Sequence, residues 1–326
     1  MLEHGGNLRD AQLRYGRGDW IDLSTGINPL GYPGPSVSAD AWQRLPEPDP
    51  ELVRAACVYY GAPQLLPVAG TQAAIQALPR LRPPARVTVA APSYAEHAQH
   101  WGRHGHTLQQ VPYAQLNEVI DASDVVVICN PNNPTGATVA PEQLLRWRER
   151  LAARGGWLVV DEAFGDTARD ASVAAQVGAP GLIVLRSVGK FFGLAGLRLG
   201  FVGAPAPLLV ELEDLLGPWT VSGPAQEIAI AALRDSHWQR TTQRRLDADG
   251  ARMHGLLAAN GIATHGTPLF HWWPEADPEA FHEHMARRAI WVRLFRQAAR
   301  GIRIGLPAHE AHWRRIEYAL QEWKER

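Results

Sequence analysis

The most restrictive feature of this sequence is the alternation, along the first two thirds of the chain, of short apolar runs with segments of helical spacing. One helical segment, 141–156 (PEQLLRWRERLAARGG), begins with proline and ends with glycine, as helices commonly do. Strands joined by helices in this way form a mostly parallel central sheet covered by helices on both faces. The apolar runs are rich in β-branched residues and lie at 87–91 (VTVAA), 125–129 (VVVIC), 157–160 (WLVV), 182–186 (LIVLR) and 199–203 (LGFVG).

The pattern changes after Pro218, where helical segments are followed by short strand-like runs. This change predicts a second, smaller α+β domain, which we expect both chain ends to form. The helical segments cover 225–234 and 237–259, and the strand-like runs lie near 268–273, 289–293 and 301–304. We therefore divide the chain into an N-terminal segment that joins the small domain and the functional site (1–36), a large domain (37–235) and a small C-terminal domain (236–326).

Composition excludes several classes of function. The 326 residues include 32 Lys and Arg against 33 Asp and Glu, and a formal net charge of −1 does not favour nucleic acid or an anionic membrane as partner. Cys57 and Cys129 are far apart and match neither a disulfide framework nor a metal site. The N-terminus is charged early, and no apolar run approaches the roughly 20 residues of a membrane span. We therefore expect a soluble cytoplasmic protein.

Chemically useful side chains follow the predicted strands. Because ligands of doubly wound sheets bind beyond the carboxyl ends of the strands, these side chains should converge on one edge. Together they match the needs of pyridoxal 5′-phosphate, whose aldehyde bonds to a lysine, whose pyridine nitrogen needs an acid and whose phosphate needs an anion-binding turn. The side chains lie in Gly70-Thr71-Gln72, Pro92-Ser93-Tyr94, Asn130–Gly136, Asp161–Phe164 and Ser187–Lys190.

Three motifs carry a family resemblance: NPNNPTG (130–136), VVDEAF (159–164) and RSVGKFFGLAGLRLG (186–200). Their order and spacing make nearly the whole chain similar to the fold-type I pyridoxal-phosphate enzymes of the aspartate aminotransferase superfamily. The resemblance implies that Lys190 bonds to the aldehyde of the cofactor and that Asp161 pairs with its pyridinium nitrogen.

The same resemblance implies the other contacts to cofactor and substrate. Asn133 would hydrogen-bond the 3′-oxygen of the ring and contact the substrate, and Tyr94 would stack on the ring. Arg303, in GIRIGLP, matches the arginine that binds the substrate carboxylate through two hydrogen bonds. The cofactor phosphate would be bound by Gly70, Thr71, Gln72, Ser187 and Arg198.

A narrower resemblance lies in HGGN (4–7), STGINPLG (24–31) and GPWTVS (217–222). These segments are similar to those of the L-threonine-O-3-phosphate decarboxylases of cobalamin biosynthesis, which are close relatives of the histidinol-phosphate aminotransferases. In that subfamily the N-terminal segment binds the phosphate of the substrate. The resemblance implies that His4, Gly26 and Asn28 contact the substrate.

Three positions depart from the superfamily pattern, one of them Gly189, which stands where a threonine often precedes the lysine. Leu45, in LPEPDP, stands where a tyrosine normally reaches the cofactor phosphate of the partner subunit, and Phe164 replaces a tyrosine near the ring oxygen. The resemblance nevertheless implies a homodimer, because sites in this superfamily lie at a dimer interface.

The residues leave the reaction open. One hypothesis is decarboxylation of L-threonine-O-3-phosphate to (R)-1-amino-2-propanol phosphate, the work of a carbon–carbon lyase. The alternative is an aminotransferase acting on a phosphorylated amino compound such as histidinol phosphate. A non-catalytic regulator that binds pyridoxal phosphate is less favoured, because the chain has no basic helix-turn-helix pattern. The histidines lack zinc-site spacing, so we expect no metal and place His282 and His284 at the surface.

Overall fold

The computed structural model describes residues 4–325 and divides the chain into two compact units. The large unit contains residues 31–133 and 137–239. The small unit contains the N-terminal residues up to Leu30, a short insertion at Pro134–Gly136, and the chain from Arg240 onward. The boundaries predicted at residues 36 and 235 stay a prediction.

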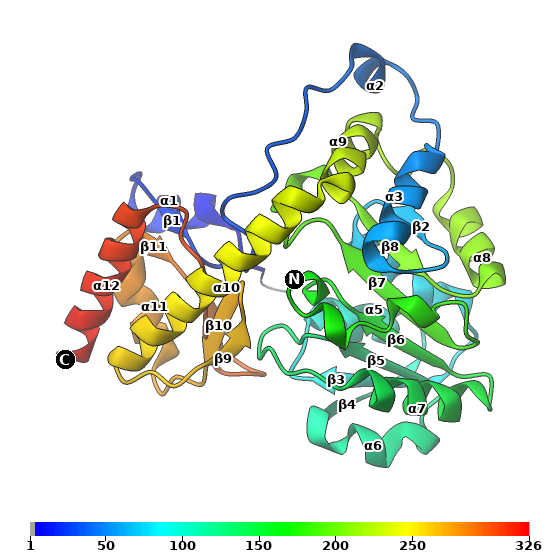
Figure 1. Ribbon diagram of the computed structural model, residues 1–326. Coiled ribbons are helices and arrows are strands. Elements are labelled where there is room, and N and C mark those ends of the chain that lie inside the picture. Colours follow the sequence, from blue (N-terminus) through cyan, green and yellow to red (C-terminus); the bar gives the residue numbers. More distant parts are fainter. Residues whose placement is uncertain (1–3, 326) are drawn as a thin grey trace. The chain divides into compact units, whose positions relative to one another are not determined.

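A seven-stranded sheet forms the centre of the large unit, in the order β2-β8-β7-β6-β5-β3-β4 (Figure 1). Five strands, β3 to β7, run parallel to their neighbours within this group, whereas β8 is antiparallel to both β7 and β2. The prediction of a mostly parallel sheet is therefore confirmed. The strands are β2 (Leu66–Val68), β3 (Arg86–Ala91), β4 (Thr107–Pro112), β5 (Val125–Cys129), β6 (Trp157–Asp161), β7 (Leu182–Ser187) and β8 (Gly200–Gly203).

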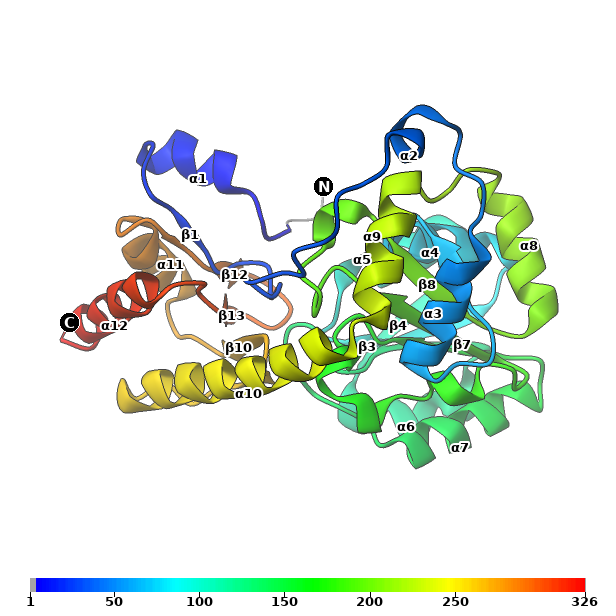
Figure 2. The ribbon, with the colours of Figure 1, turned by 45° about the horizontal axis from the view of Figure 1, so that its top comes forward.

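Helices lie on both faces of this sheet, as Figures 1 and 2 show. The segment predicted at 141–156 is helical as α7, which starts at Pro141 and buries Leu144, Trp147 and Leu151 along one stripe. The helices of the large unit are α2 (Ala39–Gln43), α3 (Pro50–Tyr60), α4 (Thr71–Ala77), α5 (Ala95–Arg103), α6 (Leu116–Val119), α7 (Pro141–Ala152), α8 (Ala206–Leu216) and α9 (Gly223–Arg234). A 24-residue helix, α10 (Ser236–Ala259), continues the chain into the small unit.

The core explains why the central strands are so apolar. Val127, Val159 and Ile183 come from three adjacent strands and are each no more than 1% exposed. Burying one such side chain stabilises the fold by about 1.5–3 kcal/mol. Strands covered on both faces must be apolar on both faces, which is why β5 and β7 read as continuous rather than alternating runs.

Both chain ends build the small unit. Near the N-terminus, α1 (Leu8–Tyr15) precedes β1 (Ile21–Asp22), which pairs in parallel with β11 (Ile290–Trp291). The prediction that both chain ends form this part is thereby confirmed. An antiparallel sheet in the order β12-β13-β10-β9 follows α10. Its strands are β9 (His265–Thr267), β10 (Phe270–Trp273), β12 (Arg293–Phe295) and β13 (Gly301–Gly305), and the remaining helices are α11 (Pro278–Ala286) and α12 (Glu310–Lys324).

The surface prediction for the histidines was wrong for His284. This side chain is 1% exposed on α11, and its Nε2 lies 2.7 Å from the carbonyl oxygen of Ala319 on α12. His282 is half-buried against the ring of Trp291.

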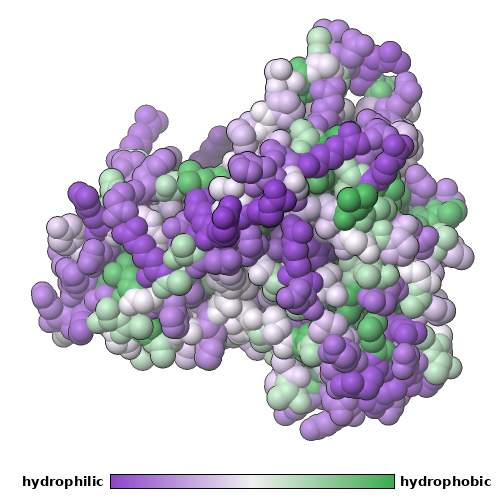
Figure 3. All heavy atoms as spheres, viewed as in Figure 1, coloured by the Kyte–Doolittle hydropathy of each residue, from purple (hydrophilic) through white to green (hydrophobic). Residues whose placement is uncertain are grey.

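On the face drawn in Figure 3, exposed hydrophobic residues occur in small groups among hydrophilic ones. Among residues 4–325, no helix combines the length and the apolarity that crossing a membrane requires.

A buried ion network joins β7 to the segment that follows β6. Arg186, on β7, is 3% exposed, and its guanidinium lies 2.5 Å from the carboxylate of Glu162 and 3.0 Å from that of Asp166. The same guanidinium stacks over the ring of Tyr60. Two carboxylates are thus buried around the guanidinium of Arg186. Each depends on this positive charge to offset the free-energy cost of burying its own negative charge.

We expect Arg186→Leu to lower the free energy of unfolding by about 3–5 kcal/mol, because it leaves Glu162 and Asp166 buried without their cation. Urea unfolding followed by circular dichroism measures this loss. Arg150→Leu is the control, since it removes an exposed arginine that also makes two hydrogen bonds to one carboxylate, that of Asp121. Equal effects of the two substitutions would contradict the expectation.

Candidate active site

One pocket of the large unit gathers every residue predicted to bind the cofactor. It lies at the carboxyl ends of the parallel strands, where β5, β6 and β7 finish at Cys129, Asp161 and Ser187. This is the edge at which doubly wound sheets bind ligands. The predicted residues that line the pocket are Gly70, Thr71, Gln72, Tyr94, Asn133, Asp161, Ser187, Lys190 and Arg198.

Lys190 follows β7 and is half-buried in this pocket. Its Nζ lies 5.3 Å from the centre of the Phe164 ring, which is within the range of a cation–π contact. The aromatic ring that replaces the superfamily's tyrosine is therefore part of the pocket wall beside the amine.

Asp161 is the last residue of β6 and is 5% exposed. Its Oδ1 accepts a hydrogen bond from the backbone N–H of Ala163 at 3.0 Å, and its Oδ2 lies 2.8 Å from Nε2 of His97 on α5. Burial lowers the pKa of His97, but the hydrogen bonds to Asp161 and Cys129 outweigh it and raise the pKa to about 10. The imidazole thus carries the proton of this pair, which leaves a carboxylate in the pocket wall.

His97, Cys129 and Asp161 also form a cluster whose ligand atoms lie within 4.8 Å of one another. Two ligands of a tetrahedral zinc ion, each about 2.0–2.1 Å from the metal, stand about 3.3 Å apart. The separation of 2.8 Å between His97 and Asp161 is instead that of a hydrogen bond. The cluster therefore has the geometry of groups that share a proton.

Another part of the pocket lining carries groups that suit an anion. Gly70 caps α4 with φ +74, and a Cβ at this position would collide with the guanidinium of Arg198. Arg198 itself has left-handed backbone geometry and donates to the carbonyl oxygen of Ala195 at 2.9 Å. The Ser187 hydroxyl lies beside them in the lining. A guanidinium, a hydroxyl and the N–H groups that begin a helix suit a phosphate.

Tyr94 and Asn133 complete the predicted cofactor set. Tyr94 stands at the N-cap of α5, half-buried, and its ring meets the edge of the His97 ring at a centroid distance of 6.1 Å. Burial, with the charge of Glu96, raises the pKa of its hydroxyl, which therefore stays protonated. Asn133 is half-buried in the lining. The contacts of these two residues with a cofactor stay predictions.

Arg303 lies in the small unit, on β13, and is 4% exposed. One Nη donates to the carbonyl oxygen of Ser24 at 2.5 Å. On the neighbouring strand β12, Arg293 is the residue paired with Arg303, so two cations stand on adjacent strands. Burial, and then the charge of Arg293, lowers the pKa of Arg303 to about 9. Like charges in such a pair destabilise a sheet, so the pair favours a bound anion.

Two glycines next to His4, one of the residues predicted to bind substrate, contact the same Ser24. The N–H of Gly6 donates to Ser24 Oγ at 2.7 Å, and a Cβ at Gly5 would collide with the Ser24 carbonyl. The two glycines thus allow the segment that starts at His4 to lie on the loop after β1. Ser24 in turn is fixed by Asp22, whose Oδ1 accepts from both its N–H and its hydroxyl.

Gly26 and Asn28 shape the rest of this loop. Gly26 has φ +63, which favours glycine, and Asn28 is 2% exposed. The Asn28 Oδ1 accepts from the N–H of Leu30 at 3.0 Å and from Arg245 at 2.7 Å. Asn28 therefore fixes the loop itself, and its predicted contact with substrate stays a prediction.

Sequence reasoning missed His97 and Arg293. His97 follows Tyr94 by three residues on a helix, so the spacing alone places both side chains on one face. Arg293 becomes visible only from the register of β12 against β13, which the sequence does not state. A helix predicted over 94–103 would have identified His97. No local sequence signal identifies Arg293.

We expect His97→Gln to destabilise the cofactor-free protein by about 1.5–3 kcal/mol at pH 6, because it removes a charged hydrogen bond. Folding raises the pKa of His97 from 6.5 to about 10, so this stabilisation is fully present below pH 6.5 and is lost as the pH rises through 10. Urea unfolding at pH 6, 8 and 10 measures the difference from wild type. The exposed His237→Gln is the control, and a deficit that stays constant with pH would refute the ion pair.

Comparison with known proteins agrees with this geometry. A family model described as aminotransferase class I and II matches residues 20–319. A threonine-phosphate decarboxylase of Pseudomonas aeruginosa is 50% identical over 328 residues, which cover 100% of this chain and 99% of that protein. A threonine-phosphate decarboxylase of a Sinorhizobium species is 41% identical and covers 98% of this chain and 97% of its own.

Solved structures share the fold. A histidinol-phosphate aminotransferase of Sinorhizobium meliloti, in complex with pyridoxal-5′-phosphate, has a TM-score of 0.83 at 22% identity, covering 99% of this chain and 95% of its own. An L-threonine-O-3-phosphate decarboxylase of Porphyromonas gingivalis has a TM-score of 0.78 at 19% identity. The match covers 93% of this chain and 99% of that protein. The architecture is that of fold-type I. The chain belongs to the aminotransferase class I and II family.

Proposed function

We propose that this protein is a pyridoxal-phosphate-dependent carboxy-lyase that converts L-threonine-O-3-phosphate to (R)-1-amino-2-propanol phosphate in cobalamin biosynthesis. The observation that carries the proposal is the single pocket in which Lys190, Asp161 and a phosphate-binding turn meet. Two relatives named threonine-phosphate decarboxylase, 50% and 41% identical over nearly the whole chain, support the choice of reaction.

The residues of the pocket fit the cofactor. Lys190 would supply the amine that bonds to its aldehyde, Asp161 would accept from its ring nitrogen, and Asn133 would contact its ring oxygen. Its phosphate is taken by the start of α4 together with Ser187 and Arg198. When bound, pyridoxal phosphate supplies an electron sink for the negative charge that remains on the substrate when CO2 departs.

The residues of the chain hold protons where this chemistry needs them. The carboxylate of Asp161, oriented by Ala163 and His97, favours a proton on the ring nitrogen, which strengthens the electron sink. Lys190 would hold the cofactor through its amine, and the same amine would be the group in this pocket able to return a proton to the α-carbon after CO2 has left. The ring of Phe164 lies 5.3 Å from this amine and forms part of the pocket wall beside it.

The substrate carries two anions, and the small unit offers groups for both. Arg303 binds the carboxylate, and Arg293 beside it adds the second cation. His4 binds the phosphate, with Gly26 and Asn28 shaping the loop next to it. The hydrogen bonds of Ser24 to Gly6 and Arg303 support this assignment, because they tie the N-terminal segment and the buried arginine to the same residue.

The aminotransferase alternative has less support. A histidinol-phosphate aminotransferase of a Geobacillus species is 30% identical over 259 residues, which cover 72% of this chain. The structural neighbours that share this name are near 20% identical and indicate the fold alone. The same pocket residues would serve either reaction, so an assay must separate the two.

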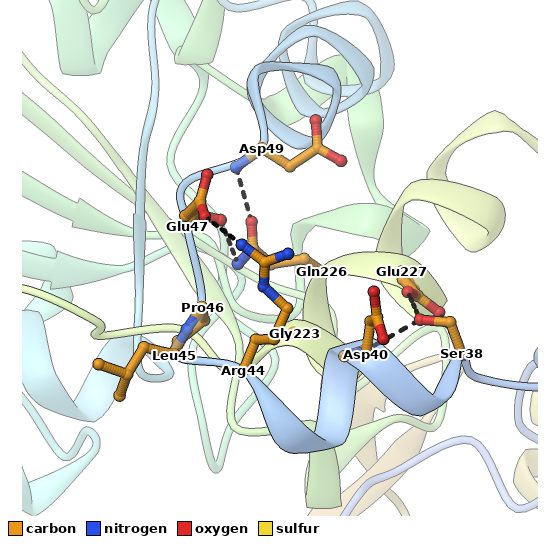
Figure 4. Close-up of a pocket in the computed structure, with 11 residues that line it drawn as sticks. Ser38, Asp40, Arg44, Leu45, Pro46, Glu47, Asp49, Gly223, Gln226 and Glu227 are labelled. Carbon is orange, nitrogen blue, oxygen red and sulfur yellow. Dashed lines mark hydrogen bonds and ion pairs between the residues drawn. The ribbon is translucent and has the colours of Figure 1, made fainter.

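We further propose that the protein is a cytoplasmic homodimer. The loop that carries α2 displays Trp42 at 70% and Leu45 at 65% exposure, as a surface buried by a second copy would. This loop is fixed to α9 by Ser38–Glu227 and by Asp49–Gln226, and Figure 4 shows Leu45 pointing away from those contacts. The free thiols of Cys57 and Cys129 suit a reducing cytoplasm.

Incubation of the purified protein with L-threonine-O-3-phosphate and pyridoxal phosphate, without a keto acid, should release CO2 and (R)-1-amino-2-propanol phosphate. We expect Lys190→Ala to remove the borohydride-sensitive visible band and to lower turnover by at least about 10³-fold, because the nucleophilic amine is lost. Lys324→Ala, which removes the exposed lysine of α12, is the control. Product that forms only when a keto acid is added would establish the aminotransferase instead.

His4→Ala should raise KM for threonine phosphate by about 10- to 100-fold, the loss of one charge-assisted hydrogen bond. With one anion released, the substrate turns more freely, so the share of transamination relative to CO2 release should rise. Both products are measured, and unphosphorylated threonine is compared on the wild type. His265→Ala, an exposed histidine of the same unit, is the control. If KM and the product ratio are unchanged, His4 does not bind the substrate phosphate, and the N-terminal segment only packs against the rest of the small unit.

A further inference from the structure

A chain of hydrogen bonds runs from the Tyr94 ring into the protein, and it contains two residues, Glu96 and His100, to which the proposed function gives no role. The Tyr94 hydroxyl lies 3.3 Å from Oε1 of Gln72, and Nε2 of Gln72 lies 2.8 Å from Oε2 of Glu96. The same Glu96 oxygen lies 3.0 Å from Nε2 of His100. Four side chains from α4 and α5 are thus joined in one line that ends at the pocket.

The chemistry of these groups sets the direction of each bond. The carboxylate of Glu96 only accepts hydrogen bonds, so the Gln72 amide must turn its NH2 toward it. The carbonyl of that amide then faces Tyr94, and the Tyr94 hydroxyl donates. His100 must donate from Nε2, which fixes the position of its proton. Glu96 therefore decides, through Gln72, which way the Tyr94 hydroxyl points.

The burial of this line argues that it is more than packing. Glu96 is 7% exposed and His100 is 8% exposed, although apolar residues of similar volume would fill the same space without the cost of desolvating a charge. Glu96 lies in the first turn of α5, where the helix dipole stabilises a negative charge. Gln72 and His100 each present an N–H donor to one oxygen of the Glu96 carboxylate.

Two sets of contacts hold the Tyr94 ring from different sides. His97 meets the ring with its edge and is itself bonded to Asp161, whereas Gln72 accepts from the hydroxyl at the far end of the ring. Since α5 places Tyr94 and His97 three residues apart, and Glu96 and His100 four apart, one helix carries both supports.

We propose that Glu96 and His100 are positioning residues, which act through Gln72 to fix the tilt of the Tyr94 ring against the bound cofactor. The inference rests on the proposed function, because Tyr94 is the ring expected to stack on pyridoxal phosphate. Glu96→Gln replaces an obligate acceptor with an amide that also donates, so the Gln72 amide can turn over and Tyr94 loses its fixed acceptor. His100→Leu removes the donor that holds the carboxylate in place.

The test is a double-mutant cycle on cofactor affinity, with the visible circular dichroism of the bound cofactor as a second readout. Glu96→Gln should raise the apparent dissociation constant for pyridoxal phosphate about 5-fold and weaken the dichroic band in the presence of Tyr94. In the Tyr94→Phe background, which lacks the hydroxyl, the same substitution should change the constant by no more than about 1.5-fold. Coupling between two side chains that do not bond each other is what a relay requires.

Matched variants separate positioning from folding. His100→Gln can still donate to Glu96 and should retain most of the affinity, whereas His100→Leu should resemble Glu96→Gln. Glu142→Gln, in the first turn of α7 and exposed, should leave affinity and dichroism unchanged. Thermal unfolding of each cofactor-free variant identifies any that fail to fold, and the remaining variant, Glu96→Gln or His100→Leu, then completes the cycle.

Each outcome decides the matter. Equal effects of Glu96→Gln with and without the Tyr94 hydroxyl overturn the relay and leave the proposed function standing. Failure of His100→Gln to rescue what His100→Leu loses overturns it as well. A wild-type protein that binds no pyridoxal phosphate overturns the proposed function, and this inference with it.

Discussion

The parallel pairing of β5, β6 and β7 is the constraint on which the functional site depends. Its register sets Cys129 opposite Asp161 and Asp161 opposite Leu185, so the three strands end at one edge. Because these strands are buried on both faces, their apolar side chains cannot slip without losing core contacts. The edge is therefore rigid, and the groups that follow each strand reach the same pocket.

That constraint also explains how much of the molecule could be predicted from its sequence. The sheet, its helices and the pocket residues are encoded by local signals: β-branched runs, a proline start, and polar groups at strand ends. The two edge strands β2 and β4 carry no such signal, since β4 is largely exposed and β2 spans only three residues. Arg293 was missed for a different reason, because its meaning lies in a cross-strand pairing between distant segments.

Two neighbouring acids show how one strand end serves both chemistry and stability. Side chains alternate along a strand, so Asp161 and Glu162 leave β6 in opposite directions. Asp161 faces the pocket and bonds to His97, whereas Glu162, fully buried, accepts from Arg186, from the hydroxyl of Ser172 and from the N–H of Val173. The same motif thus supplies one carboxylate that lines the pocket and one that is buried in an ion pair with Arg186.

The two carboxylates are stabilised by different partners, and the difference fits their tasks. Glu162 is bonded to a permanently charged guanidinium, which fixes the position of its side chain. Asp161 has an imidazole partner that can give up its proton, although its raised pKa keeps the proton in place near neutral pH. The Asp161 carboxylate accepts one hydrogen bond from His97. Because a carboxylate has about four acceptor sites, it can still accept a hydrogen bond from a ligand in the pocket. Asp161 in the pocket lining thus has a partner that can lose its charge, whereas Glu162, the next residue in the sequence, has a partner that cannot.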